Sequence, residues 1–419
     1  MEKNIIKKMT LPEYVYIPMA QNYKSHCLPF VEAGEHVKAG QPIGYTSSTI
    51  GAPIYASVSG EIVAIESNSE IEGADNTVIV IKSDDKQEIW DGIKKPIVND
   101  LASFIVAIKT SGMIGLEGAS LGTHTKFDSK TIDNVNTLIV NGAEWTLWSN
   151  FEKEIMTADI KKLLDGIQLT MKYMGLQECF IGIKDDMKQE IKQMTTEILA
   201  KNINNVKVIP LPQSCPQGSD RVLIYETTGE IIGPKNLPED FGYVVANLAS
   251  LALLGEYVDT GMPLTKRMIS VEGDAMKTAT DVIAPIGAKI SDIVSFCGGY
   301  KVPPKKIVIG GPTLRRPLEN DNVPLAKDNN SIMAFTETNI ANIDDEESCK
   351  DCTRCDGVCP INLSPKALYE AFNDGNIQKL AVLGLSKCTE CGRCSFVCPA
   401  RKPLSFMIEQ AKMLIANPS

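Results

Sequence analysis

The chain has 419 residues, 43% of them hydrophobic and 22% charged, which is ordinary for a globular protein of about two to four domains. Its net charge of −10 argues against nucleic acid as a partner, because phosphate binding needs a basic surface. The first residues lack the apolar core of a secretory signal, and no run approaches the about 20 apolar residues that span a bilayer. We therefore expect a cytoplasmic protein with reduced cysteines and no transmembrane span of its own.

Residues 1–95 predict a small all-β domain. Short β-prone runs between residues 31 and 66 are separated by glycines, which is typical of a sandwich or barrel, with Val58, Ile62 and Ile65 as expected core residues. The layout resembles the barrel-sandwich domains of lipoyl and biotinyl carriers. The hairpin at residues 56–60 has no lysine to modify, so we expect a docking module that is not lipoylated.

Residues 98–262 predict an α/β domain. Apolar runs that read as buried strands alternate with amphipathic helical runs, which favours βαβ units and a largely parallel sheet. The strands are expected at 135–140, 179–183 and 206–211, and the helices at 152–174 and 185–201.

A small α+β module and a connecting segment follow. Residues 263–317 indicate strand, turn, strand, helix and strand. Residues 318–345 are polar and rich in Asn and Asp between 320 and 330, so we expect a linker. Residues 346–419 form a cysteine-rich tail, in which Ser364 and Pro365 mark the start of a helix.

The tail contains the pattern C-x2-C-x2-C-x3-C-P twice, at residues 349–360 and 388–399. Three cysteines at this spacing can bind three irons of one cubane, and in two-cluster ferredoxins the fourth binds the other cluster. The predicted ligand sets are therefore Cys349, Cys352, Cys355 and Cys398 for one [4Fe–4S] cluster, and Cys388, Cys391, Cys394 and Cys359 for the second.

Zinc and disulfides are the alternatives. Structural zinc takes two separated cysteine pairs, which leaves cysteines of each motif unexplained, and a reducing compartment disfavours disulfides. The four other cysteines share no ligand spacing and are expected in the core; they are Cys27, Cys179, Cys215 and Cys297.

A glycine-rich stretch, residues 111–127, is the candidate anion-binding loop. Its glycines allow tight turns that point N–H groups at a phosphate, and His124 and Lys126 add positive charge. The spacing is neither a Rossmann fingerprint nor a Walker A loop, so a structural turn is the alternative. The sequence N-G-A-E-W-T-L-W at 141–148 follows a predicted strand, at the sheet end where α/β folds bind ligands.

The order of these motifs resembles the RnfC family, the NADH-side subunits of the Rnf electron-transport complex. That family also includes the soluble proline reductase-associated electron transfer protein. The central part is similar to the flavin-binding subunit of respiratory complex I, with a soluble-ligand-binding β-grasp (SLBB) module behind it. The resemblance implies four parts: an N-terminal barrel-sandwich hybrid, a Rossmann-like FMN-binding α/β domain, the SLBB module at 263–317, and a helical two-cluster ferredoxin domain at 346–419.

The resemblance also implies FMN in the glycine loop, NADH as electron donor and a redox partner protein, either a reductase or a membrane complex. A chain acting with a membrane complex would lie at the inner face of the membrane. The positions that match the flavin motifs are Gly115, Gly118, Ala119, Thr123, His124, Lys126, Asn141, Glu144 and Asn247. No catalytic acid, base or nucleophile is expected, because the flavin would carry the hydride chemistry.

Two departures from the family pattern motivate a second hypothesis, a flavin-free iron–sulfur adaptor. Glu117 precedes Gly118 and would repel a phosphate, at a cost of about 1 kcal/mol or more if unpaired. After N-G-A-E the family commonly has C-E-P-Y, whereas this chain has W-T-L-W at 145–148, so the acidic residue and the proline are gone and Trp145 and Trp148 have come in. The cysteine motifs show no such departure.

Overall fold

The computed structural model describes residues 6–22, 25–67, 77–115, 122–127, 134–143, 151–212, 218–233, 236–310, 315–336, 346–389 and 391–416. The chain divides into two compact units. The first unit contains Met1–Ile132, Trp145–Leu176 and Asn247–Thr338, and the second contains Asp133–Glu144, Gln177–Ala246 and Asn339–Ser419. This division cuts through the α/β domain predicted over 98–262.

Two small sheets near the N-terminus of the first unit enclose an apolar core. One sheet has the order β2 (Tyr14–Pro18), β8 (Thr77–Ser83), β7 (Gly60–Ser67) and β4 (His36–Val37), and the other has β3 (Leu28–Pro29), β5 (Pro42–Tyr45) and β6 (Ile54–Tyr55). Val58 and Ile62 are fully buried in this core, as predicted. The prediction for Ile65 is wrong, since it is 36% exposed. Beyond a β-bulge between Ile62 and Ala64, Ile65 pairs with Ile79 and lies in the exposed last part of β7.

A six-stranded sheet forms the second core of this unit. Its order is β1 (Lys7–Lys8), β14 (Thr280–Pro285), β13 (Lys266–Glu272), β17 (Ser331–Phe335), β15 (Lys306–Gly310) and β16 (Arg315–Leu318). Helix α7 (Ile290–Phe296) supplies Ile290, Ile293 and Val294 to its apolar cluster. The predicted order of strand, strand, helix and strand matches β13, β14, α7 and β15.

One boundary prediction is corrected by this sheet. The linker predicted at 318–345 is wrong for its first part, because β17 pairs in parallel with β13 and antiparallel with β15. Leu325, Lys327 and Asn329, just before β17, are buried. β1, within the all-β domain predicted at 1–95, pairs in parallel with β14 of this sheet.

Helices α1 (Leu101–Thr110), α2 (Phe151–Thr157), α3 (Ile160–Met174) and α6 (Leu248–Thr260) also belong to the first unit. Glycines allow α3 and α6 to pack closely. A Cβ atom added at Gly166 would lie 1.9 Å from the carbonyl oxygen of Leu251, and one at Gly255 would lie 2.1 Å from that of Lys162. The two helices therefore touch backbone to backbone.

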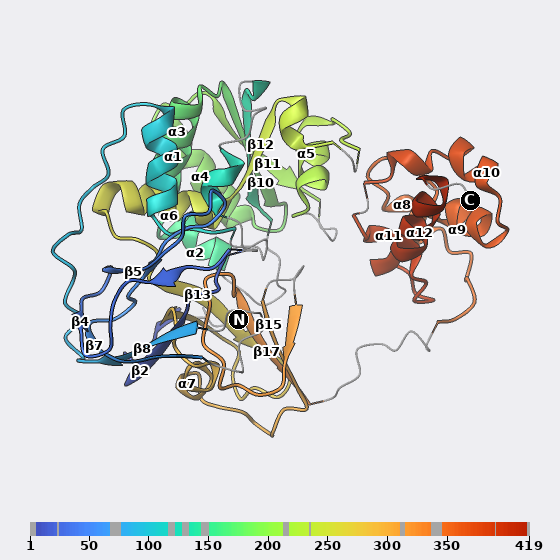
Figure 1. The fold of residues 1–419 in the computed structure, drawn as a ribbon. Coiled ribbons are helices and arrows are strands. Elements are labelled where there is room, and N and C mark those ends of the chain that lie inside the picture. Colours follow the sequence, from blue (N-terminus) through green and yellow to red (C-terminus); the bar gives the residue numbers. More distant parts are fainter. Residues whose placement is uncertain are drawn as a thin grey trace. The chain divides into compact units, whose positions relative to one another are not determined.

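The second unit contains a sheet with the order β11 (Val206–Leu211), β10 (Glu178–Lys184), β9 (Thr137–Gly142) and β12 (Tyr243–Asn247). β10 pairs in parallel with both β9 and β11, as the alternating strands and helices predicted. Helices α4 (Lys188–Ala200) and α5 (Asp220–Thr228) pack on it. Figure 1 shows these helices in green and yellow-green beside their strands.

The cysteine-rich tail is helical, drawn in orange and red in Figure 1. Its helices are α8 (Arg354–Gly357), α9 (Pro365–Asn373), α10 (Ile377–Val382), α11 (Arg393–Phe396) and α12 (Leu404–Ala416). Ser364 caps α9 by accepting a hydrogen bond from the Ala367 N–H at 3.2 Å, as predicted. Leu368, Leu380 and Ile408 belong to the small buried core.

Among the helices that the structure describes, none has both the length and the apolar character needed to cross a bilayer. The longest of them, α3, has 15 residues.

The backbone contact between α3 and α6 predicts a strong effect of a single methyl group. We expect Gly166→Ala to destabilise the protein, because overpacking costs about 1–3 kcal/mol or more while alanine gains only about 1 kcal/mol over glycine in a helix. The added methyl group would meet backbone atoms, which cannot move aside as a side chain can. We therefore expect a loss of stability at the upper end of this range. Urea unfolding measures the change. Gly233→Ala is the matched control, because its added Cβ meets no atom within 4 Å. Equal stability of the two variants would contradict the packing.

Candidate functional site

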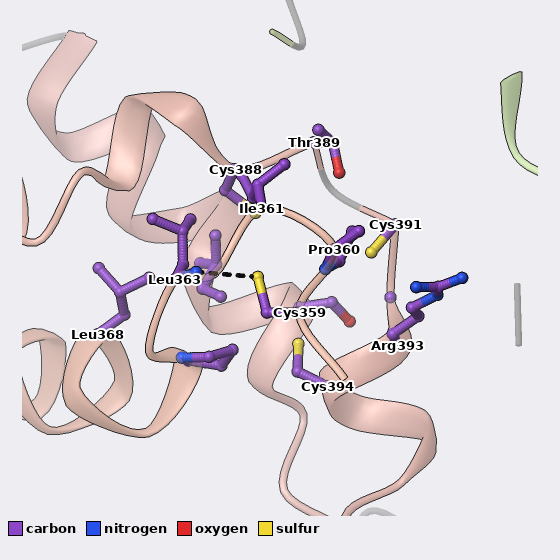
Figure 2. Close-up of a pocket in the computed structure, with 14 residues that line it drawn as sticks. Cys359, Pro360, Ile361, Leu363, Leu368, Cys388, Thr389, Cys391, Arg393 and Cys394 are labelled. Carbon is purple, nitrogen blue, oxygen red and sulfur yellow. Dashed lines mark hydrogen bonds between the residues drawn. The ribbon is translucent and has the colours of Figure 1, made fainter. Parts of the chain in front are cut away.

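The cysteines of the tail line two separate cavities. Cys349, Cys352, Cys355 and Cys398 line one, and Cys359, Cys388, Cys391 and Cys394 line the other. Figure 2 shows the second cavity, with the sulfur atoms of Cys359, Cys391 and Cys394 around a common space. Each motif thus gives three cysteines to one cavity and its fourth to the other, which is the crossed grouping that the spacing predicted.

A one-turn helix presents part of each motif. Helix α8 begins after Thr353 and α11 begins after Gly392, and both of these residues have a left-handed backbone, with φ of 54° and 74°. Glycine adopts this conformation without cost, whereas Thr353 is strained there. The two turns therefore repeat one local geometry as well as one sequence spacing.

Backbone N–H groups point at the fourth sulfur of each motif. The Leu363 N–H donates to Cys359 Sγ at 3.3 Å, and the Lys402 N–H donates to Cys398 Sγ at 3.4 Å. The donor follows its cysteine by four residues in both motifs. Such N–H donors favour negatively charged sulfur, and hydrogen bonds to sulfur are among the factors that set cluster potentials.

Burial keeps several of these thiols protonated when no metal is bound. It raises the pKa of Cys355 to about 11 and the pKa of Cys394 to about 12. Iron ligation needs thiolates, so loading such a site releases protons.

The residues present fit an iron–sulfur cubane. A cubane has iron atoms at separate corners, so its thiolates must surround a space, and both sets of four do so. Within the residues that the structure describes, no three His, Cys, Asp or Glu side chains converge closely enough to hold a single metal ion. Pro360, Ile361 and Leu363 help to line the second cavity with apolar groups.

The described ends of the glycine-rich stretch are held by the N-terminal sandwich. The Gly122 N–H donates to the Ile50 carbonyl at 2.9 Å, and His124 Nε2 lies 2.7 Å from the Thr49 carbonyl oxygen. His124 is only 3% exposed. Thr123 and Lys126 lie in the same short 3-10 helix, Thr123–Lys126, and Gly115 is half-buried before it.

Lys327 also holds the glycine-rich stretch in place through hydrogen bonds, a role that the sequence did not predict. Its ammonium donates to the carbonyl oxygens of Pro53 at 2.7 Å and Gly112 at 2.8 Å. Its backbone N–H donates to Gln21 Oε1 at 3.0 Å, and the residue is 1% exposed. This one side chain joins the sandwich to the start of the glycine-rich stretch.

The two predicted asparagines make hydrogen bonds within the chain. In the second unit, Asn141 Nδ2 donates to the Gly218 carbonyl at 2.9 Å. In the first unit, Asn247 caps α6 by accepting from the Ala249 N–H at 2.8 Å. Both asparagines therefore support the local backbone. The predicted residues Gly118, Ala119 and Glu144 lie outside the described residues, as do Glu117, Trp145, Trp148 and Cys215.

Comparisons with known proteins identify two domains. Residues 1–86 match the family described as the RnfC barrel sandwich hybrid domain, and residues 108–255 match the Nuo51 FMN-binding domain. These matches confirm the predicted barrel-sandwich domain and the predicted likeness to a flavin-binding domain.

Curated relatives extend the similarity over most of the chain. The RnfC-type subunit of the proton-translocating ferredoxin:NAD(+) oxidoreductase complex of Clostridium ljungdahlii is 32% identical over 85% of this chain and 78% of its own. The corresponding subunit of the Na(+)-translocating complex of Acetobacterium woodii is 32% identical over 86% of this chain and 81% of its own. The chain belongs to the RnfC family.

A third RnfC relative and one solved structure add detail. The corresponding subunit of the ion-translocating oxidoreductase complex of Rhodobacter capsulatus is 30% identical over 97% of this chain and 79% of its own. The fold is similar to an NAD(+)-reducing [NiFe]-hydrogenase, with a TM-score of 0.51 and 17% identity over 76% of this chain. The RnfC chain spans only 62% of that hydrogenase chain, so this likeness concerns the fold alone. Family membership makes the protein an electron-transport protein of the flavin and iron–sulfur class.

The buried hydrogen bonds of Lys327 predict that replacing this residue destabilises the protein, by an amount that depends on pH. We expect Lys327→Met to lower the free energy of unfolding by about 1–3 kcal/mol at pH 7, because it leaves two buried carbonyls unpaired. Burial lowers the pKa of Lys327 from 10.5 to about 8, so between these values the unfolded chain binds more protons than the folded chain. Wild-type stability therefore rises relative to the variant as the pH rises through that window.

Urea unfolding of both proteins at pH 7, 8, 9 and 10 measures the difference. The exposed Lys8, changed to Met, controls for the loss of a surface lysine. A difference between wild type and Lys327→Met that is small and independent of pH would contradict the role given to the buried ammonium.

Proposed function

We propose that this RnfC-family chain carries electrons between NADH and a partner protein, by way of FMN and two [4Fe–4S] clusters. The observation that carries the proposal is the crossed grouping of eight cysteines around two cavities. Residues 346–419 act as a two-cluster ferredoxin-type domain in this account. Residues 263–317, completed by β17, act as the SLBB module.

The chain's own residues have modest roles in this function. Cys349, Cys352, Cys355 and Cys398 bind one cluster, and Cys359, Cys388, Cys391 and Cys394 bind the other. Gly115 and Gly118 let the backbone approach the flavin phosphate, and Lys126 offsets its charge. FMN, when bound, converts a two-electron hydride transfer into single-electron steps. The protein supplies the position and the electrostatic field.

The relatives suggest the partner. Two of them are named as subunits of ferredoxin:NAD(+) oxidoreductase complexes that translocate protons or Na(+). We therefore propose a membrane-bound complex of this kind as the partner, with the chain at its cytoplasmic face. A soluble reductase, such as proline reductase, is the alternative partner. Co-purification with membrane subunits would distinguish the two.

One observation favours the second candidate, a flavin-free adaptor that keeps the clusters. The side chains of Asn141, Asn247 and His124 all take part in contacts within the chain. These contacts within the chain are enough to account for the three residue types, even if no flavin binds.

A cofactor inventory tests the proposal against the adaptor. Anaerobically purified protein should contain about eight iron and eight sulfide per chain, as two [4Fe–4S] clusters require, and about one FMN. Addition of NADH should bleach the flavin absorbance. Full iron and sulfide without FMN, even after reconstitution with FMN, would favour the adaptor. Colourless protein that binds only zinc would exclude both.

Single cysteine replacements test the crossed ligand sets. Because Cys398 lines the cavity of the first motif, Cys398→Ser should remove the same EPR signal as Cys352→Ser. Cys359→Ser should instead remove the signal that Cys391→Ser removes. Cys297→Ala, a buried cysteine outside both cavities, is the control and should keep both signals. If Cys398→Ser and Cys391→Ser lost the same signal, each motif would bind its own cluster.

A further inference from the structure

Arg393 is a buried cation beside one of the two cysteine cavities. It lies at the start of α11, between Cys391 and Cys394, and lines the cavity that these cysteines share with Cys359 and Cys388. Only 4% of the residue is exposed. Figure 2 labels Arg393 among the residues that line this cavity. A guanidinium cannot lose its proton near neutral pH, so the site holds a permanent positive charge.

Glu226 on α5, in the same unit, partners this cation. Both terminal nitrogens of Arg393 donate to Glu226 Oε1 at 3.2 Å. The Glu226 side chain is 17% exposed, and the residue is not among those that line the cavity. Of this ion pair, only the positively charged Arg393 lines the cavity.

The same position of the other motif gives a natural comparison. Arg354 lies between Cys352 and Cys355, as Arg393 lies between Cys391 and Cys394, and it lines the first cavity. Arg354 is exposed. Water and salt screen an exposed charge far more than a buried one, so the two arginines act on their cavities with different strength.

A permanent charge beside a redox group shifts its potential. Each one-electron reduction adds one negative charge, with no bond formed and no proton required. A nearby cation stabilises the more negative state and raises the reduction potential, and a nearby anion lowers it. Arg393 and Glu226 therefore act in opposite directions, and the arginine acts more strongly because it lines the cavity and Glu226 does not.

We propose that Arg393 sets the reduction potential of the cluster bound by Cys359, Cys388, Cys391 and Cys394, and that Glu226 offsets part of its charge. The proposal rests on the proposed function, since it requires a cluster in this cavity. The reduction potential of the second cluster then depends in part on Glu226, a residue of α5 that lies outside the tail.

An EPR-monitored redox titration of the purified, cluster-loaded full chain tests the proposal. Arg393→Gln should shift one of the two midpoint potentials to a more negative value, because it removes the cation and leaves Glu226. Glu226→Gln should shift the same midpoint to a more positive value. Arg393→Lys keeps the charge and should stay close to wild type. A structural defect alone would not produce shifts of opposite sign in the two neutral variants.

Arg354→Gln is the matched control. It should leave the midpoint that responds to Arg393 unchanged and should shift the other one less. If Arg393→Gln fails to fold, the positive shift in Glu226→Gln still decides the case. Two clusters with midpoints that do not move in either variant would overturn this proposal alone. Wild-type protein with fewer than two clusters would overturn the proposed function itself.

Discussion

The crossing of the cysteine motifs is the constraint on which the tail depends. Neither cavity has its four sulfur atoms until both motifs are in place, so the segment between them must fold first or at the same time. That segment contributes Leu368 and Leu380 to a small buried core, together with Cys394 itself. A core of this size gives limited stability in a segment of about 70 residues, and metal binding can supply the rest. With the proposed clusters, insertion would therefore be coupled to the folding of the tail.

The three closely spaced cysteines of each motif could be grouped because their information is local, whereas the place of the fourth came from the known arrangement of two-cluster ferredoxins. Spacing along the chain fixes which thiols fall on one turn, and α8 and α11 reproduce that turn. The parallel sheet of the second unit was predictable for a similar reason, since buried strands show as short apolar runs between helical ones. The start of α9 followed from its capping serine and first proline.

The segment before β17 was mispredicted because its structure depends on distant partners. Asn and Asp between residues 320 and 330 indicate a solvated linker when they are judged by composition. The structure buries Lys327 instead, since Gln21, Pro53 and Gly112 satisfy its donors. These partners lie 215 to 306 residues away in the sequence. No pattern within the segment itself could have revealed them.

The order of the strands in the six-stranded sheet bears on how the protein is made. β17, at residues 331–335, lies between β13 and β15, while β1 at the edge comes from residues 7–8. The sheet can close only after nearly the whole first unit has left the ribosome, and the first cysteine motif begins at Cys349, soon afterwards. Pairing of such distant segments is slow. A nascent chain thus exposes the cysteines of the first motif while its main β-sheet is still assembling.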